Sequence, residues 1–143
     1  MATRREQILA QIATTLASTA GVSGRVYRSR ATAMARAESP AIIVEPITDT
    51  CQQLTSLPKL DWTLRVRVVV TIRSTNAYTV ADSIIESMHS LLMADLTLGG
   101  IAQDIQPQIT NFDFFDADQP AGVFSNEYEV KYRTTVADLS SEF

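Results

Sequence analysis

The sequence contains one cysteine, Cys51, and one histidine, His89, in 143 residues. A single cysteine excludes an intramolecular disulfide and the cysteine clusters that hold structural zinc. A nucleophile needs an activating base within hydrogen-bond reach, so a thiol or triad mechanism would have to use His89. Five glycines and five prolines exclude a collagen-like or linker-like chain.

Long hydrophobic runs are also missing, since no stretch approaches the roughly 18 apolar residues that span a membrane. The first eleven residues are basic and then amphipathic, without the apolar run and cleavage site of a signal peptide. With 45% hydrophobic and 20% charged residues, the composition is typical of a soluble globular protein. From the N-terminal pattern we expect the chain to be made and folded in a cytoplasm. The length predicts one domain over residues 1–137, followed by a loose C-terminal tail at 138–143.

Two segments have the apolar spacing of amphipathic helices. In residues 3–19, Ile8, Leu9, Ile12 and Leu16 form one stripe, and a threonine at position 3 with a glutamate three residues later fits a capping box. Residues 79–94 present a broad apolar face. We therefore predict one helix at each place.

Alternation predicts the strands. In residues 60–73 the even positions are apolar and most odd positions are polar, which is the strongest strand pattern in the chain. Residues 123–135 alternate in the same way, and 101–118 reads as a bent or edge strand between prolines. Shorter strands are expected at 25–28 and 41–44, and the polar segment 48–59 reads as a long loop.

The order of these elements predicts an α+β fold. We expect an antiparallel or mixed sheet of four to five strands with both helices packed on one face. The other face would carry rows of charge, with Arg65 and Arg67 placed to pair with Glu127 and Glu129 if their strands are antiparallel neighbours. Such a face can be solvated, can form a subunit contact or can line a channel.

Charge is distributed unevenly along the chain. Residues 1–36 have a balance of +5 and residues 95–143 a balance of −7, within a net charge of −4. Two faces of opposite sign would suit head-to-tail association of identical subunits. The alternative is that these segments interleave and their charges cancel locally. The acidic total argues against a sequence-specific DNA-binding protein.

The search for catalytic or ligand-binding residues yields little. Cys51 has only His89 as a possible partner, and a histidine on a helix face is far more often structural or exposed. Asp113, Asp116 and Asp118 lack the remaining ligands of a calcium loop, so turn formation is the better explanation. We predict no enzyme activity, no metal site and no cofactor.

The layout from Arg5 to Thr135 resembles the tail-terminator proteins of long-tailed bacteriophages, also called tail-completion or minor tail proteins. Most of the resemblance lies in Met-Ala-Asp-Leu-Thr-Leu-Gly-Gly at 93–100 and in the closing strand Val-Lys-Tyr-Arg-Thr at 130–134. The helix ending in Ala-Gly-Val-Ser-Gly at 20–24 and the segment Ser-Pro-Ala-Ile-Ile-Val-Glu-Pro at 39–46 also match.

This resemblance implies a structural virion protein that forms a homo-oligomer, a hexameric ring, at the head-proximal end of the tail. The ring would terminate polymerisation of the tail tube protein and offer a surface for joining the head through a head-completion or connector protein. DNA would pass through the lumen without specific binding. The chain would act in the tail or neck of the virion after assembly in the host cytoplasm, with no membrane partner.

The resemblance also yields candidate contacts between subunits or with partners. N-terminal arginines would form a basic face, aspartates after residue 112 an acidic one, and the 48–59 loop would project toward the tube or the next ring. The candidates are Arg25, Arg28, Arg30, Arg36, Arg65, Arg67, Asp113, Asp116, Asp118, Glu127 and Glu129. Two alternatives stay open: another neck component, such as a head-completion or connector subunit, and a small enzyme or ligand-binding domain, which would need a pocket with perturbed ionisable groups.

Overall fold

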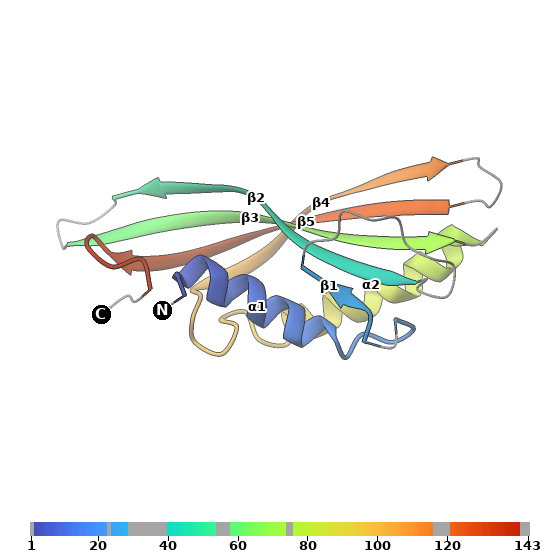
Figure 1. Ribbon diagram of the computed structural model, residues 1–143, viewed down its shortest axis with the longest axis horizontal. Coiled ribbons are helices and arrows are strands. Elements are labelled where there is room, and N and C mark those ends of the chain that lie inside the picture. The colour runs from blue at the N-terminus through green and yellow to red at the C-terminus, as the bar shows by residue number, and fades with distance from the viewer. Residues whose placement is uncertain are drawn as a thin grey trace.

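In the part of the chain that the structure describes, five strands form one mixed sheet, and two helices cover one of its faces (Figure 1). This computed structural model describes residues 2–22, 24–28, 40–53, 58–73, 76–115 and 121–140. The elements are α1 (Arg4–Leu16), β1 (Val26–Tyr27), β2 (Ala41–Gln52), β3 (Lys59–Arg73), α2 (Ala77–Met93), β4 (Asp104–Phe115) and β5 (Ala121–Thr135). The predicted α+β fold with a mixed sheet is therefore confirmed.

The strand order is β1-β2-β3-β5-β4, so the short β1 and the long β4 lie at opposite edges of the sheet. β1 pairs with β2 in parallel, and the other three pairings are antiparallel. β3 lies at the centre between β2 and β5, with Leu64 opposite Val130. The first and the fourth strands of the chain therefore form the two edges, and the last strand, β5, lies inside the sheet.

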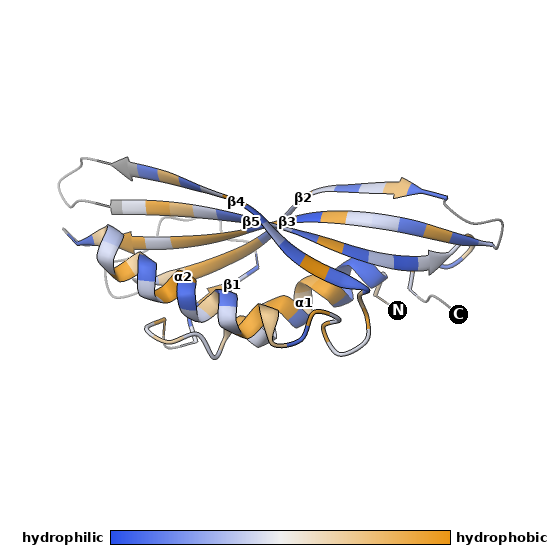
Figure 2. Cartoon of the chain, turned by 180° about the vertical axis from the view of Figure 1, so that it is seen from behind, coloured by the Kyte–Doolittle hydropathy of each residue, from blue (hydrophilic) through white to orange (hydrophobic). Residues whose placement is uncertain are grey.

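The central strands bury one face against the helices. Leu64, Val66, Val68 and Val70 of β3 are fully buried, as the alternation predicts. Figure 2 shows hydrophobic and hydrophilic residues alternating along β3 and β5, with the helices below them. A fully buried aliphatic side chain of this kind contributes about 1.5–3 kcal/mol of transfer free energy, so this row and the helix stripes hold the layers together.

α1 begins at a threonine cap and ends before a turn. The Oγ1 of Thr3 accepts a hydrogen bond from the backbone N–H of Glu6 at 3.2 Å, which satisfies one of the unpaired amides of the first turn. The buried stripe consists of Ile8, Leu9, Ile12 and Leu16. The predicted helix is thus present, although it ends at Leu16 instead of residue 19.

The segment after α2 is an aspartate-capped turn. Asp95 accepts hydrogen bonds from the backbone N–H and hydroxyl of Thr97, at 3.1 and 2.8 Å, and from the Gly99 N–H at 2.8 Å. These bonds hold the pKa of Asp95 below its usual range, with the Thr97 hydroxyl as the main cause. The turn buries Leu98 at a positive φ of 52°. The stretch at 93–100 therefore ends α2 and forms one defined turn that the carboxylate of Asp95 holds by hydrogen bonds.

β2 is longer than the sequence predicts. The expectation of a loop over 48–59 is wrong for its first part, because β2 continues to Gln52 and pairs with β3 along its whole length. A bulge at Ile47 inserts one residue between Pro46 and Thr48. Before the bulge the even positions of β2 face the helices, as Val44 does opposite Val68. After the bulge the odd positions face them, as Asp49 does opposite Leu64. The alternation is broken at the bulge, which hides the strand in the sequence.

The chain end after β5 contacts the start of α1. The backbone N–H of Arg4 donates to the Leu139 carbonyl at 2.7 Å, and the Gln7 side chain donates to the Ser140 carbonyl at 3.1 Å. The first of these satisfies another open amide of the first helical turn. The segment expected as a loose tail is tied to α1 at these two residues, and its last three residues lie outside the described ranges.

Candidate interaction surfaces

The sheet face opposite the helices carries charged side chains that pair across strands. Arg65 lies 3.6 Å from Glu127 and 3.7 Å from Glu129. This confirms the pairing that alternation predicts for Arg65. Arg67 lies opposite Glu127 in the register but forms its ion pair with Glu45 of β2, at 3.5 Å.

These pairs make the central part of the charged face nearly balanced. A cleft of 370 Å³ opens on it, lined by the four predicted side chains together with Ile47 and three threonines, Thr48, Thr50 and Thr63. Ion pairs this exposed contribute about 0.2–1 kcal/mol each, and salt screens them. At this place the charges of β2, β3 and β5 cancel locally.

Two predicted arginines lie together at the β1 edge. Arg28 donates to both carboxylate oxygens of Glu6, at 2.8 and 3.0 Å, and so connects β1 to α1. This bidentate bond from Arg28 lowers the pKa of Glu6 and raises that of Arg28 itself. Arg25 donates from Nε to the Pro40 carbonyl at 2.8 Å. The sequence did not indicate the pair with Glu6, because the contact joins a helix to a strand.

The remaining predicted contact residues are not gathered with these. Asp113 is exposed on β4, opposite Val123, at the other edge of the sheet from Arg25 and Arg28. Two arginines and two aspartates lie outside the described residues, namely Arg30, Arg36, Asp116 and Asp118. The structure therefore places the described candidates in three groups: the balanced face, the β1 edge and β4.

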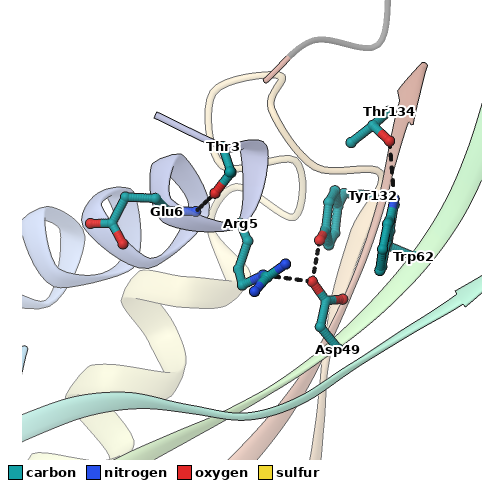
Figure 3. Close-up of polar contacts among 7 residues, drawn as sticks. All are labelled: Thr3, Arg5, Glu6, Asp49, Trp62, Tyr132 and Thr134. Atoms are coloured by element: carbon teal, nitrogen blue, oxygen red, sulfur yellow. Dashed lines mark hydrogen bonds and ion pairs between the residues drawn. The ribbon is translucent and has the colours of Figure 1, made fainter. Parts of the chain in front are cut away.

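A polar cluster between α1 and the sheet was not predicted (Figure 3). The Oδ2 of Asp49 accepts hydrogen bonds from the Arg5 guanidinium at 2.9 Å and from the hydroxyl of Tyr132. The Asp49 side chain is 8% exposed, and its Oδ1 is buried without a hydrogen-bond partner. Burial, followed by the bond to Asp49, raises the pKa of Tyr132 well above its ordinary value.

Trp62 completes this cluster from β3. Its ring stacks on Tyr132 with centroids 6.1 Å apart and an angle of 10° between the planes. Its Nε1 donates to the Oγ1 of Thr134 at 3.0 Å. The cluster fixes the first turn of α1 against three strands. No pattern in the sequence indicates it, because Asp49 lies after the bulge, where the alternation of β2 is lost.

A groove runs between α2 and the edge strand β4. Its main cavity measures 590 Å³, and an adjoining cavity of 170 Å³ shares Asp82, Ile85 and Thr110 with it. In Figure 2, β4 passes in front of the other strands, and α2 also lies on the side of the molecule that faces the viewer. The histidine of the chain, His89, lines this groove on α2. No local pattern in the sequence indicates the groove, because it forms where a helix crosses the edge of the sheet.

Within the described ranges, no group of three or more His, Cys, Asp or Glu side chains is placed to hold a metal ion. No helix among those residues has the length and apolar character needed to cross a membrane. No protein-family model matches the chain, and no curated protein matches it.

Proposed function

We propose that this chain is a structural subunit of a bacteriophage tail, a tail terminator that assembles into a ring at the head-proximal end of the tail tube. The ring would stop polymerisation of the tube and present a surface to the head-side proteins. The resemblance at 93–100 and 130–134 is the origin of this proposal.

The structural observation that supports it most is the contrast between the two edges of the sheet. The β1 edge carries Arg25 and Arg28, of which Arg28 is paired with Glu6, whereas the β4 edge borders a groove lined by Asp82 and Glu86. A subunit with two unlike, complementary edges can associate head to tail, and such contacts close into a ring when the rotation allows. The fold is also the α+β type that the resemblance implies.

Both stretches that carry the resemblance form defined structure. The first is the turn capped by Asp95, which ends α2 and buries Leu98. The second lies in β5 and includes Tyr132, which helps to anchor α1 through Asp49. A structural subunit needs rigid elements of this kind, because an assembly contact loses affinity when loose segments must be ordered on binding.

The test is to delete the gene from the phage that carries it and to measure tail lengths by electron microscopy. Overlong tails of variable length without heads are the expected result, because nothing would stop the tube. Supplying the wild-type gene from a plasmid should restore uniform tails and joined heads, which controls for effects on neighbouring genes.

Two other outcomes would contradict the proposal. Tails of normal length beside unjoined heads would assign the chain to head completion. Normal infectious particles would exclude any essential role in the neck.

A further inference from the structure

We infer that the groove between α2 and β4 receives the β1 edge of a second copy of this chain. This inference rests on the proposed ring, and it specifies which two surfaces of the subunit meet. The groove below means the surface around Asp82, Ile85, Glu86 and Glu127, and the β1 edge means Arg25 and Arg28 with the strand between them.

One stripe of α2 forms the first wall of the groove. Asp82, Ile85, Glu86 and His89 follow the spacing i, i+3, i+4 and i+7, so they share one face of the helix. The buried stripe of α2 is a different set that includes Ile84, Met88 and Leu92. The helix therefore has a second, mostly polar face that lines the groove, and its one apolar member, Ile85, also packs against the core.

The border of the groove is unusually apolar for a surface. Tyr78 is 58% exposed, Ile109 49% and Phe112 54%, and these are three of the six large hydrophobic side chains that are exposed in the described part of the chain. The rings of Tyr78 and Phe112 lie 5.8 Å apart, on either side of the gap between α2 and β4. Apolar side chains gathered in this way mark surfaces that bind a partner.

The charge of the groove defines the partner. Among the described residues, its main cavity is lined by no lysine or arginine, and it is lined by the carboxylates of Asp82 and Glu86 and by Glu127, whose charge is compensated by Arg65. A matching surface should therefore combine cations with apolar groups. A second copy of the groove does not fulfil this condition, because two acidic surfaces would repel each other.

The β1 edge of this chain does fulfil it. Its strand reads Arg-Val-Tyr-Arg over 25–28, so two guanidinium groups flank Val26, which also packs against the core, and Tyr27. Arg28 is already paired with Glu6 of its own subunit, whereas Arg25 binds a neutral carbonyl, that of Pro40, and keeps its charge. All four residues are partly exposed. Because β1 and β4 are the two outer strands of the sheet, joining them links one subunit to the next in a single direction.

The contact should depend on side chains more than on added strand pairing. Pro107 has no N–H to donate, and a bulge at Gln108 interrupts the middle of β4. The inferred contact therefore consists of arginine–carboxylate pairs around an apolar centre, and salt should weaken it.

The first test is chemical cross-linking with a short bis-maleimide in a Cys51→Ser background. A variant with both Gln108→Cys in the groove and Tyr27→Cys on the β1 edge, which keeps both arginines, should give a ladder of dimers and larger products. Each single-cysteine variant should stay monomeric on a denaturing gel. An equimolar mixture of the two single variants should stop at dimers, which shows that one groove meets one β1 edge.

Three results would overturn the inference. One is a dimer from Gln108→Cys alone, because groove would then meet groove. Another is the absence of cross-links from the double variant at the highest soluble concentration. The third is formation of rings, seen by native mass spectrometry or electron microscopy, without this cross-link.

A second test uses charge and a matched control. Glu86→Gln should lower the association constant about two- to fivefold, the effect of one exposed ion pair. Ser90→Lys makes the same change of charge at an exposed position of α2 that does not line the groove, and it should leave association within error of wild type. Equal effects of the two variants would show that only net charge matters and would contradict a specific contact.

The two proposals fail separately. Rings without the groove cross-link would reject this contact and leave the terminator function in place. A positive cross-link together with tails of normal length in the deletion phage would reject the terminator function and leave the contact in place.

Discussion

The hydroxyl of Tyr132 donates a hydrogen bond to the carboxylate of Asp49, a residue 83 positions away in the chain. Because Arg5 binds the same oxygen, this one carboxylate joins α1, β2 and β5. The contact links the first helix to the last strand, and it lies next to the stacked ring of Trp62. It therefore reports on whether the two ends of the chain are packed together.

Replacing Tyr132 with phenylalanine removes this hydroxyl and leaves the rings in place. Tyr132→Phe should lower the free energy of unfolding by about 1–3 kcal/mol, the usual cost of removing a buried hydrogen bond to a charged group. Urea denaturation followed by the fluorescence of Trp62, the single tryptophan, measures it directly. Tyr78→Phe, at a position that is 58% exposed, is the control and should cost much less. Equal costs would show that the bond to Asp49 contributes nothing specific.

Alkaline pH should destabilise the fold through two buried tyrosines. Burial raises the pKa of Tyr128, and burial together with Asp49 raises that of Tyr132. The pKa of each tyrosine is higher in the folded protein than in the unfolded chain, where it is about 10. Each therefore stabilises the fold fully below that pH, and this contribution is lost as pH rises through the pKa of the folded protein. Tyrosinate absorbance and circular dichroism should therefore change together above pH of about 10. Ionisation of all four tyrosines with intact circular dichroism would contradict this.

Gly122 is a position in β5 where no larger residue fits. A Cβ there would lie 2.7 Å from the ring of Phe124 and 2.9 Å from the Cβ of Ala77. Phe124 is fully buried, so its ring has little room to move. Gly122→Ala should lower the free energy of unfolding by about 1–3 kcal/mol through overpacking, measured by urea denaturation. Ser125→Ala on the same strand is the control, and a Gly122→Ala protein as stable as wild type would show that the helix layer adapts.

Sequence patterns predicted the long regular elements well and the bulged ones poorly. β3 and α2 were predicted within two residues at each end, because one buried face imposes an unbroken period over many residues. The strand predicted at 41–44 is only the first part of β2, which continues to Gln52, because the bulge at Ile47 shifts the alternation and places the polar Asp49 on the buried side. A single bulge is enough to make half of a strand look like a loop.

For the candidate surfaces too, contacts within regular strands were predictable and contacts between a helix and the sheet were not. The contact of Arg65 with Glu127 and Glu129 was predictable, because register follows from two alternating strands that pair. The Arg28–Glu6 pair and the groove between α2 and β4 depend on how a helix crosses a sheet, which no local pattern specifies. Tertiary arrangement, and not residue type, decides which charges meet.

Acid should weaken the turn after α2. The Thr97 hydroxyl and the two backbone amides hold the pKa of Asp95 below its ordinary value. A lowered folded pKa contributes stability above the unfolded value of about 3.9 and loses it as pH falls through the folded value. Asp95→Asn should therefore destabilise the protein at neutral pH, and the difference from wild type should shrink as the pH approaches 3 or so. Thermal unfolding at several pH values checks this, and a difference that is independent of pH would contradict it.

Arg28 allows the internal and the intersubunit roles of the β1 edge to be separated. Arg28→Glu breaks the bidentate pair with Glu6 and places two carboxylates next to each other. Because the exposed Arg28–Glu6 pair contributes only about 0.2–1 kcal/mol, the monomer should stay folded. If the β1 edge also contacts the groove of a neighbour, the reversed charge should weaken assembly, which light scattering can measure. The double variant Arg28→Glu with Glu6→Arg restores the internal pair while β1 keeps the wrong charge, so we expect thermal stability to recover and assembly to stay weak. Recovery of both would assign Arg28 to the internal pair alone, and unchanged assembly in the single variant would remove it from the contact.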